Sequence, residues 1–229
     1  YKIKKPVNLG FLDFSTIGMR SHYCEEELRL NRRLAPEIYL DVVTVRGTQA
    51  APRIGGDGPI IEYAVKMREF PQDALASRML EHGKFEAADV DALAALIADF
   101  HAGATPAGHD DRFGAPDTII SAALQNFEQI MPRLRLARTK EAAQLLREWT
   151  EREGAARRGD FTRRKRADRV RECHGDLHLG NIVVAGGRPL PFDCIEFNDE
   201  LRWIDVLNEV AFVVMDLHDR GRQIGRAHV

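Results

Sequence analysis

The chain has 229 residues, 44% of them hydrophobic and 30% charged, with 33 Lys and Arg against 35 Asp and Glu. This is the composition of an ordinary globular protein, and a formal net charge of −2 gives no reason to expect a nucleic-acid partner. Three scattered cysteines predict no disulfide framework, and no apolar run is long enough for a membrane span, so we expect a cytoplasmic protein.

The N-terminal third alternates β-rich runs with one helix. The runs typical of strands occupy residues 1–7, 38–45 and 59–67. A helix is expected over 21–35, where Glu27, Leu30 and Leu34 follow one another at spacings of three and four and so share a face. The glycine-rich segment 55–58 predicts a hairpin turn. We therefore expect a small sheet that carries one helix.

Helical periodicity dominates after residue 67. Helices are expected over residues 89–102, 119–136 and 140–153. In the last of these, Leu145, Leu146 and Trp149 are expected to be core residues. The basic block at 157–171 is expected to be a solvated loop or helix face, because Phe161 is its one aromatic residue and nucleic-acid binding would need more.

The most informative segment is HGDLHLGN at 174–181, which is followed by two apolar runs around Gly186 and Gly187. This pattern predicts a β-hairpin. A three-residue turn would set Asn181 opposite Asp193, whereas a two-residue turn would shift the register by one and set them diagonally. The prolines of the second run leave either register open.

Opposed residues on paired strands have Cβ atoms about 4.5–5.5 Å apart, so Asn181 and Asp193 could hold one cation between them. Oxygen ligands of this kind suit Mg²⁺, which also binds the phosphates of a substrate. Asp176, five residues before Asn181, could then take the proton of an acceptor hydroxyl as the base of a phosphoryl transfer.

The same residues carry a family resemblance. His174, Gly175, Asp176, Leu177 and Asn181 match the kinase catalytic-loop pattern H-R-D-L-x-x-x-N with Gly in place of Arg, and Asp193 follows at the distance of the DFG aspartate. With this glycine and the later IDVLNEVAF at 204–212, the chain resembles the aminoglycoside phosphotransferase family. FHA at 100–102 resembles the Leu-His end of a helix in that family, and VKMREF at 65–70 resembles its hinge.

The resemblance implies an α+β, protein-kinase-like fold of two lobes. A partial β-rich N-lobe would occupy residues 1–67, and the hinge and a mainly helical C-lobe with the catalytic β-hairpin would occupy 68–223. Residues 224–229 resemble a translated sequencing adapter and are expected to be an artefactual tail.

The resemblance also implies a role for each matching residue. Asp176 would be the catalytic base, Asn181 and Asp193 the metal ligands, and His174 and Asp205 structural supports, with Asp205 bracing the catalytic loop.

For the nucleotide, Lys2 would bind the phosphates with Glu27 as its ion-pair partner, and Met67 and Glu69 of the hinge would contact ATP. Lys4 shares a strand face with Lys2 and is the alternative phosphate-binding lysine. Glu25 and Glu26 adjoin Glu27 and are the alternative ion-pair partners.

Two departures from the kinase pattern are visible. The glycine-rich phosphate loop would precede the first residue of the chain, and Cys194 and Ile195 replace the Phe and Gly that follow the DFG aspartate.

The predicted activity is transfer of the ATP γ-phosphoryl group, with Mg²⁺, to a hydroxyl of a small molecule such as an aminoglycoside or another metabolite. One alternative is an inactive nucleotide-binding module. The other is a zinc-dependent hydrolase built on His174, Asp176 and His178 with Cys173 or Cys194. No membrane partner is expected, and a downstream nucleotide-binding domain is a possible addition.

Overall fold

The fold was described from a computed structural model, which covers residues 1–10 and 12–221. The predicted tail at 224–229 lies outside the described residues. The described residues divide into two compact units, one within 1–104, 173–202 and 207–221, the other of residues 105–172 and 203–206. Seven α-helices and three antiparallel sheets make up the described part, which agrees with the predicted mixture of α and β structure, while the division into two lobes stays a prediction. No helix among the described residues is long and apolar enough to cross a bilayer.

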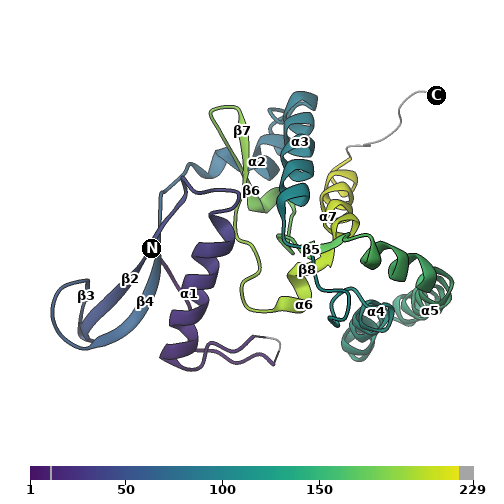
Figure 1. The fold of residues 1–229 in the computed structure, drawn as a ribbon, viewed down its shortest axis with the longest axis horizontal. Coiled ribbons are helices and arrows are strands. Elements are labelled where there is room, and N and C mark those ends of the chain that lie inside the picture. Colours follow the sequence, from purple (N-terminus) through teal and green to yellow (C-terminus); the bar gives the residue numbers. More distant parts are fainter. Residues whose placement is uncertain (11, 222–229) are drawn as a thin grey trace. The chain divides into compact units, whose positions relative to one another are not determined.

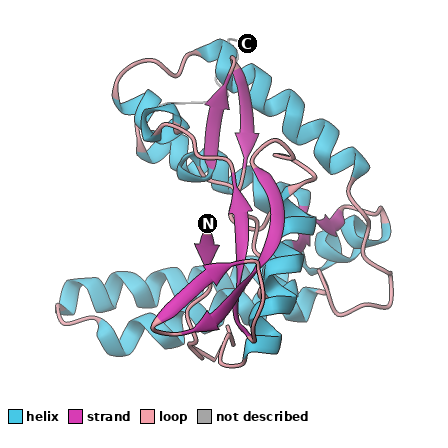
Figure 2. Ribbon diagram, turned by 90° about the vertical axis from the view of Figure 1, so that its left-hand side faces the viewer, coloured by secondary structure: helices cyan, strands magenta, loops and turns pink. Residues whose placement is uncertain are grey.

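The first unit contains a four-stranded antiparallel sheet, which is visibly curled (Figures 1 and 2). Its strands, in the order β1-β4-β2-β3, are β1 (Lys2–Ile3), β4 (Ile60–Met67), β2 (Tyr39–Thr48) and β3 (Ala51–Ile54). The hairpin turn predicted at the glycine-rich segment is wrong, because this segment connects β3 to β4, which both pair with β2 and not with each other. The tight turn of this region lies between Thr48 of β2 and Ala51 of β3, which are paired. Strand β3 was not predicted, because its four residues are exposed and show no apolar alternation.

Helix α1 (Ile17–Asn31) packs against this sheet, as the two lie side by side in Figure 1. It begins earlier than predicted because Thr16 caps its N-terminus, accepting a hydrogen bond from the Met19 amide. Its buried Cys24 and Leu28 join a core with Tyr39, Val65 and residues of a later hairpin. The helix thus presents Glu27, also fully buried, toward the interior of the unit.

The remainder of the first unit is mainly helical. Its helices are η1 (Gln72–Ala74), α2 (Ala76–Glu81), α3 (Ala87–Gly103), η3 (Leu179–Asn181), α6 (Asp199–Arg202) and most of α7 (Val206–Asp219). Leu93 and Ile97 of α3 form a core with Leu177, Val213 and Leu217. The apolar stripe predicted on 89–102 is therefore confirmed as a core face.

The hairpin strands β6 (Ile182–Ala185) and β7 (Arg188–Pro191) pair Ala185 with Arg188, so Gly186 and Gly187 form a two-residue turn. The three-residue turn that would set Asn181 opposite Asp193 is wrong, and the two-residue alternative holds. Two successive glycines, both with positive φ, supply the backbone that a tight hairpin turn of this length requires.

The second unit contains α4 (Pro116–Ile130), η2 (Met131–Arg133), α5 (Ala137–Arg166), β5 (Val170–Glu172) and β8 (Trp203–Asp205). The basic block lies largely on α5, where Arg157, Arg158 and Arg163 form ion pairs with acidic side chains of the same unit. The expected core role of Leu145, Leu146 and Trp149 is wrong, since all three are more than half exposed. Within this unit α5 packs mainly on α4, and one neighbour cannot cover every apolar face of a long helix.

Candidate active site

The second residue of the catalytic-loop segment is a glycine that no other residue could replace without strain. Gly175 has φ +90°, and a Cβ built on it would lie 2.7 Å from the Leu201 carbonyl oxygen. This explains physically why Gly stands where protein kinases carry Arg.

Glu209 of α7 holds this segment in place. Its Oε1 accepts hydrogen bonds from the backbone amides of His174 (2.5 Å) and Gly175 (2.8 Å), and its Oε2 lies 2.6 Å from His101 Nε2. Burial opposes ionisation of this carboxyl, but the hydrogen bond from His101 and the neighbouring donors outweigh it, and the pKa of Glu209 lies below its usual value. Sequence reasoning missed this contact of Glu209 with the loop. An acidic residue within the mainly apolar run 204–212 was the signal that could have found it.

Asp205, predicted to brace the same loop, has a different partner. Its two carboxylate oxygens accept from Arg164 Nε and Nη2 at 2.6 and 2.8 Å, a bidentate pair within the second unit. Glu209 donates no proton here but accepts from the loop backbone, while the bracing role of Asp205 stays a prediction.

His174 connects the loop to the segment that follows the hairpin. Its Nε2 lies 2.9 Å from the Phe192 carbonyl oxygen, and its Nδ1 accepts from the Asp176 amide at 3.3 Å. Complete burial lowers the pKa of His174, so the neutral ring, with one donor and one acceptor nitrogen, suits both contacts.

Asp176 and Asn181 lie against each other. Asn181 Nδ2 donates to Asp176 Oδ2 at 3.1 Å and to the Asp176 carbonyl oxygen at 3.0 Å. With the amide nitrogen engaged, Asn181 Oδ1 is the atom left for a cation. The Asp176 carboxylate is 42% exposed, so a molecule from solution can reach it.

Asp193 follows the hairpin in a left-handed conformation, φ +64°, which is uncommon for a residue other than glycine. The preceding Phe192 amide donates to the Asn181 carbonyl oxygen at 2.9 Å, so Asn181 and Asp193 are diagonal neighbours. The Asp193 amide donates to the Tyr39 hydroxyl at 3.1 Å. This tertiary contact helps hold the strained backbone.

Lys2 joins the sheet to Asp193. Its Nζ lies 2.5 Å from Asp193 Oδ1 and 2.8 Å from Glu27 Oε1. Burial disfavours the ammonium, but the two carboxylates outweigh burial and hold the pKa of Lys2 above its usual value. The predicted pair of Lys2 and Glu27 is thus brought together with a predicted metal ligand.

Lys4, the alternative lysine, lies deeper. Its Nζ donates to Glu27 Oε2 at 2.7 Å and to Glu196. Burial disfavours the charged forms of both Lys4 and Glu196. The carboxylates of Glu27 and Glu196 outweigh burial at Lys4 and raise its pKa, whereas burial dominates at Glu196 and raises the pKa of that carboxyl. Sequence reasoning did not foresee this contact of Glu196, because nothing in the local pattern joins it to the first strand.

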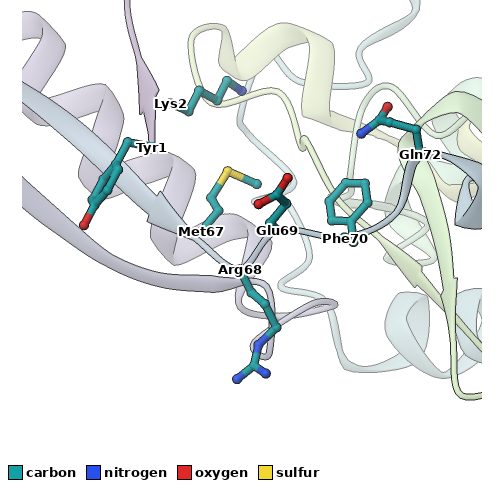
Figure 3. Close-up of a pocket in the computed structure, with 7 residues that line it drawn as sticks. All are labelled: Tyr1, Lys2, Met67, Arg68, Glu69, Phe70 and Gln72. Atoms are coloured by element: carbon teal, nitrogen blue, oxygen red, sulfur yellow. The ribbon is translucent and has the colours of Figure 1, made fainter.

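A pocket of about 270 Å³ opens beside Lys2 (Figure 3). Its lining residues are Tyr1, Lys2, Met67, Arg68, Glu69, Phe70 and Gln72. Lys2, Met67 and Glu69 are three of the four residues predicted to contact the nucleotide, and the fourth, Glu27, is bound to Lys2. The Arg68 side chain points away from the others in Figure 3, and its Nε donates to the Glu37 carbonyl oxygen.

The residues suggested for a zinc hydrolase do not form a ligand cluster of their own. Among the described residues, one group of His, Cys, Asp or Glu has ligand atoms within 4.8 Å of one another, and it consists of His101, Cys173 and Glu209. His174, Asp176, His178 and Cys194 are outside it. In this group Glu209 already accepts three hydrogen bonds, two of them from the loop, so the cluster is a hydrogen-bonded support.

A model of the phosphotransferase enzyme family matches residues 17–227, which include the hairpin, the catalytic loop and Glu209. The chain belongs to this family. The matched segment includes Asp176, Asn181 and Asp193, whereas Lys2 lies before it.

Curated relatives from Mycobacterium bovis and from two strains of Mycobacterium tuberculosis, CDC 1551 and H37Rv, are uncharacterized proteins. Each is 28% identical to the chain over 223 residues, which are 97% of the chain and 43% of the relative. The chain therefore spans less than half the length of these relatives. No solved structure matches the chain significantly.

Proposed function

We propose that the chain forms the phosphoryl-transfer core of a kinase that uses ATP and Mg²⁺ to phosphorylate a hydroxyl of a small molecule. The observation that carries the proposal is the contact of Lys2 with both Glu27 and Asp193. A lysine from the first strand, an acid from a helix and an acid after the hairpin are brought together here, and membership of a phosphotransferase family supports a phosphoryl-transfer site at this place.

The pocket beside Lys2 suits a nucleotide. Met67 and Phe70 supply apolar surface for a flat base, and Arg68 and Glu69 line the same space. The Lys2 ammonium at the pocket wall would meet the phosphates, which would compete with Asp193 for its positive charge.

The donor set fits a hard divalent cation. Asn181 Oδ1 and the Asp193 carboxylate are oxygen ligands from diagonal positions, and the Asp193 side chain is 43% exposed, so it is open to an incoming ion. Mg²⁺ bound there would neutralise charge on the phosphoryl oxygens.

Asp176 would act as the base. Because its Oδ2 accepts from Asn181, Oδ1 is the oxygen available to an acceptor hydroxyl. The hydroxyl oxygen attacks the γ-phosphorus, its proton passes to Asp176, and ADP leaves with the electrons of the broken bond. Positioning and charge neutralisation supply most of the acceleration in such a reaction.

The test is ATP consumption by the full-length protein over a panel of amino-sugars, sugars and amino alcohols, compared between wild type and Asp176→Asn. We expect Asp176→Asn to lower turnover by about 10²–10⁴-fold without changing nucleotide affinity. Asp57→Asn, in an exposed turn, serves as the matched control. Equal turnover of wild type and Asp176→Asn would defeat the assignment of Asp176 as the base. Nucleotide binding without turnover in either protein would support the inactive nucleotide-binding module.

A further inference from the structure

His178 lies in the catalytic loop and its position bears on Asp176. Its Nδ1 accepts a hydrogen bond from the Gly180 amide at 3.0 Å. An imidazole nitrogen that accepts carries no proton, so in the neutral ring the proton is on Nε2. Nε2 is the nitrogen that lies 3.6 Å from Asp176 Oδ2. The backbone contact therefore selects the tautomer that presents a donor to the base.

Gly180 makes room for this ring. A Cβ built on Gly180 would lie 2.8 Å from His178 Cε1 and 2.9 Å from His178 Nδ1, with no other atom within 4 Å. Gly180 does not have a positive φ, so the backbone itself does not require glycine. The absence of a side chain at Gly180 leaves room for the imidazole ring of His178.

We propose that His178 is a positioning residue for the base of the proposed phosphoryl transfer, on which this inference rests. Asn181 Nδ2 and His178 Nε2 approach the same oxygen, Asp176 Oδ2, and would fix the plane of the carboxylate so that Oδ1 faces the acceptor hydroxyl. The 3.6 Å between His178 Nε2 and Asp176 Oδ2 is longer than a hydrogen bond, and catalytic contacts of this kind commonly shorten when substrate binds.

Two substitutions at His178 test the contributions of its two ring nitrogens separately. In His178→Asn the amide oxygen can accept from Gly180, but the shorter side chain does not reach Asp176. In His178→Gln the longer side chain can present an N–H near the place of Nε2. We expect His178→Asn to lower kcat by about 10- to 100-fold with the KM for ATP unchanged, and His178→Gln to keep kcat within a few-fold. The same two substitutions at the exposed His82 are the matched controls.

Gly180→Ala gives a test that leaves His178 in the protein. We expect it to lower kcat by displacing the ring, and to cause no additional loss in a His178→Ala background. The inference is overturned if His178→Asn retains wild-type kcat, if His178→Gln is the more impaired of the two, or if the Gly180→Ala loss persists without His178. Thermal unfolding of each variant identifies loss through misfolding, which would assign His178 to loop structure instead. Wild type without phosphoryl transfer to any acceptor would overturn the proposed function and this inference together.

Discussion

Lys2 Nζ and Asp193 Oδ1 lie 2.5 Å apart although 191 positions separate the two residues in the sequence. The contact joins the first strand of the sheet to the residue that follows the hairpin. Glu27 extends it to α1, so three distant segments meet at one ammonium group.

Lys2→Met removes the ammonium but keeps much of the side-chain length. We expect kcat/KM for ATP to fall by roughly 100-fold, because a single well-placed charge partner of a phosphoryl group contributes on that order. Steady-state kinetics with varied ATP measures the effect. Unchanged kinetics would show that Lys2 does not meet the phosphates.

Lys4→Met would act on stability. Lys4 is 95% buried between Glu27 and Glu196, and its loss leaves the buried Glu196 without its lysine partner and Glu27 with Lys2 alone. Breaking a buried pair in this way costs about 3–5 kcal/mol of unfolding free energy. Urea denaturation measures it, with the exposed Lys5→Met as control. A loss no larger than that of the control would refute the structural role.

Glu209 should make stability depend on pH. Its folded-state pKa lies below the usual 4.5, so its contribution is fully present above that pH and is lost as the pH falls through the folded-state value. We expect the unfolding free energy of wild type to decline below pH 4.5, and Glu209→Gln to show a shallower decline.

At neutral pH we expect Glu209→Gln to cost about 1.5–3 kcal/mol, because hydrogen bonds to a charged acceptor are lost. Denaturant titrations at several pH values give both quantities, and the exposed Glu25→Gln is the control. Identical pH profiles for wild type and Glu209→Gln would contradict the prediction.

Gly175→Ala and Gly186→Ala form a matched pair. Both glycines have positive φ, but only at Gly175 would the new Cβ meet the backbone, 2.7 Å from the Leu201 oxygen, whereas Gly186 is open. We expect about 1 kcal/mol of destabilisation at Gly186 and clearly more at Gly175, with loss of activity there alone. Equal effects at both positions would exclude a role for the Leu201 contact.

Asp193→Asn should change the metal requirement. An amide binds Mg²⁺ less strongly than a carboxylate, so the Mg²⁺ concentration for half-maximal activity should rise at least several-fold while the fold is kept. A Mg²⁺ titration of activity, with circular dichroism as the check on folding, measures the shift. The same half-maximal concentration in both proteins would remove Asp193 from the metal site.

Local pattern was enough to predict α3, β4 and the catalytic hairpin, because their periodicity and glycines act over short distances. The hairpin register was not fixed by pattern, since turns of two and three residues fit the same glycines. The contact of Glu209 with the loop was not predicted, because it forms only when α7 packs against the loop in the folded chain. Leu145 and Trp149 show the converse, since helical periodicity marks an apolar face without showing what covers it.

The sharing of Glu27 by two lysines has an electrostatic consequence. Lys2 and Lys4 carry two positive charges among three carboxylates, those of Glu27, Asp193 and Glu196. Even with Glu196 protonated, these charges only cancel, so the cluster is neutral at best. A polyphosphate arriving alone would find little surplus attraction, whereas one accompanied by a divalent counter-ion would bring the missing positive charge with it.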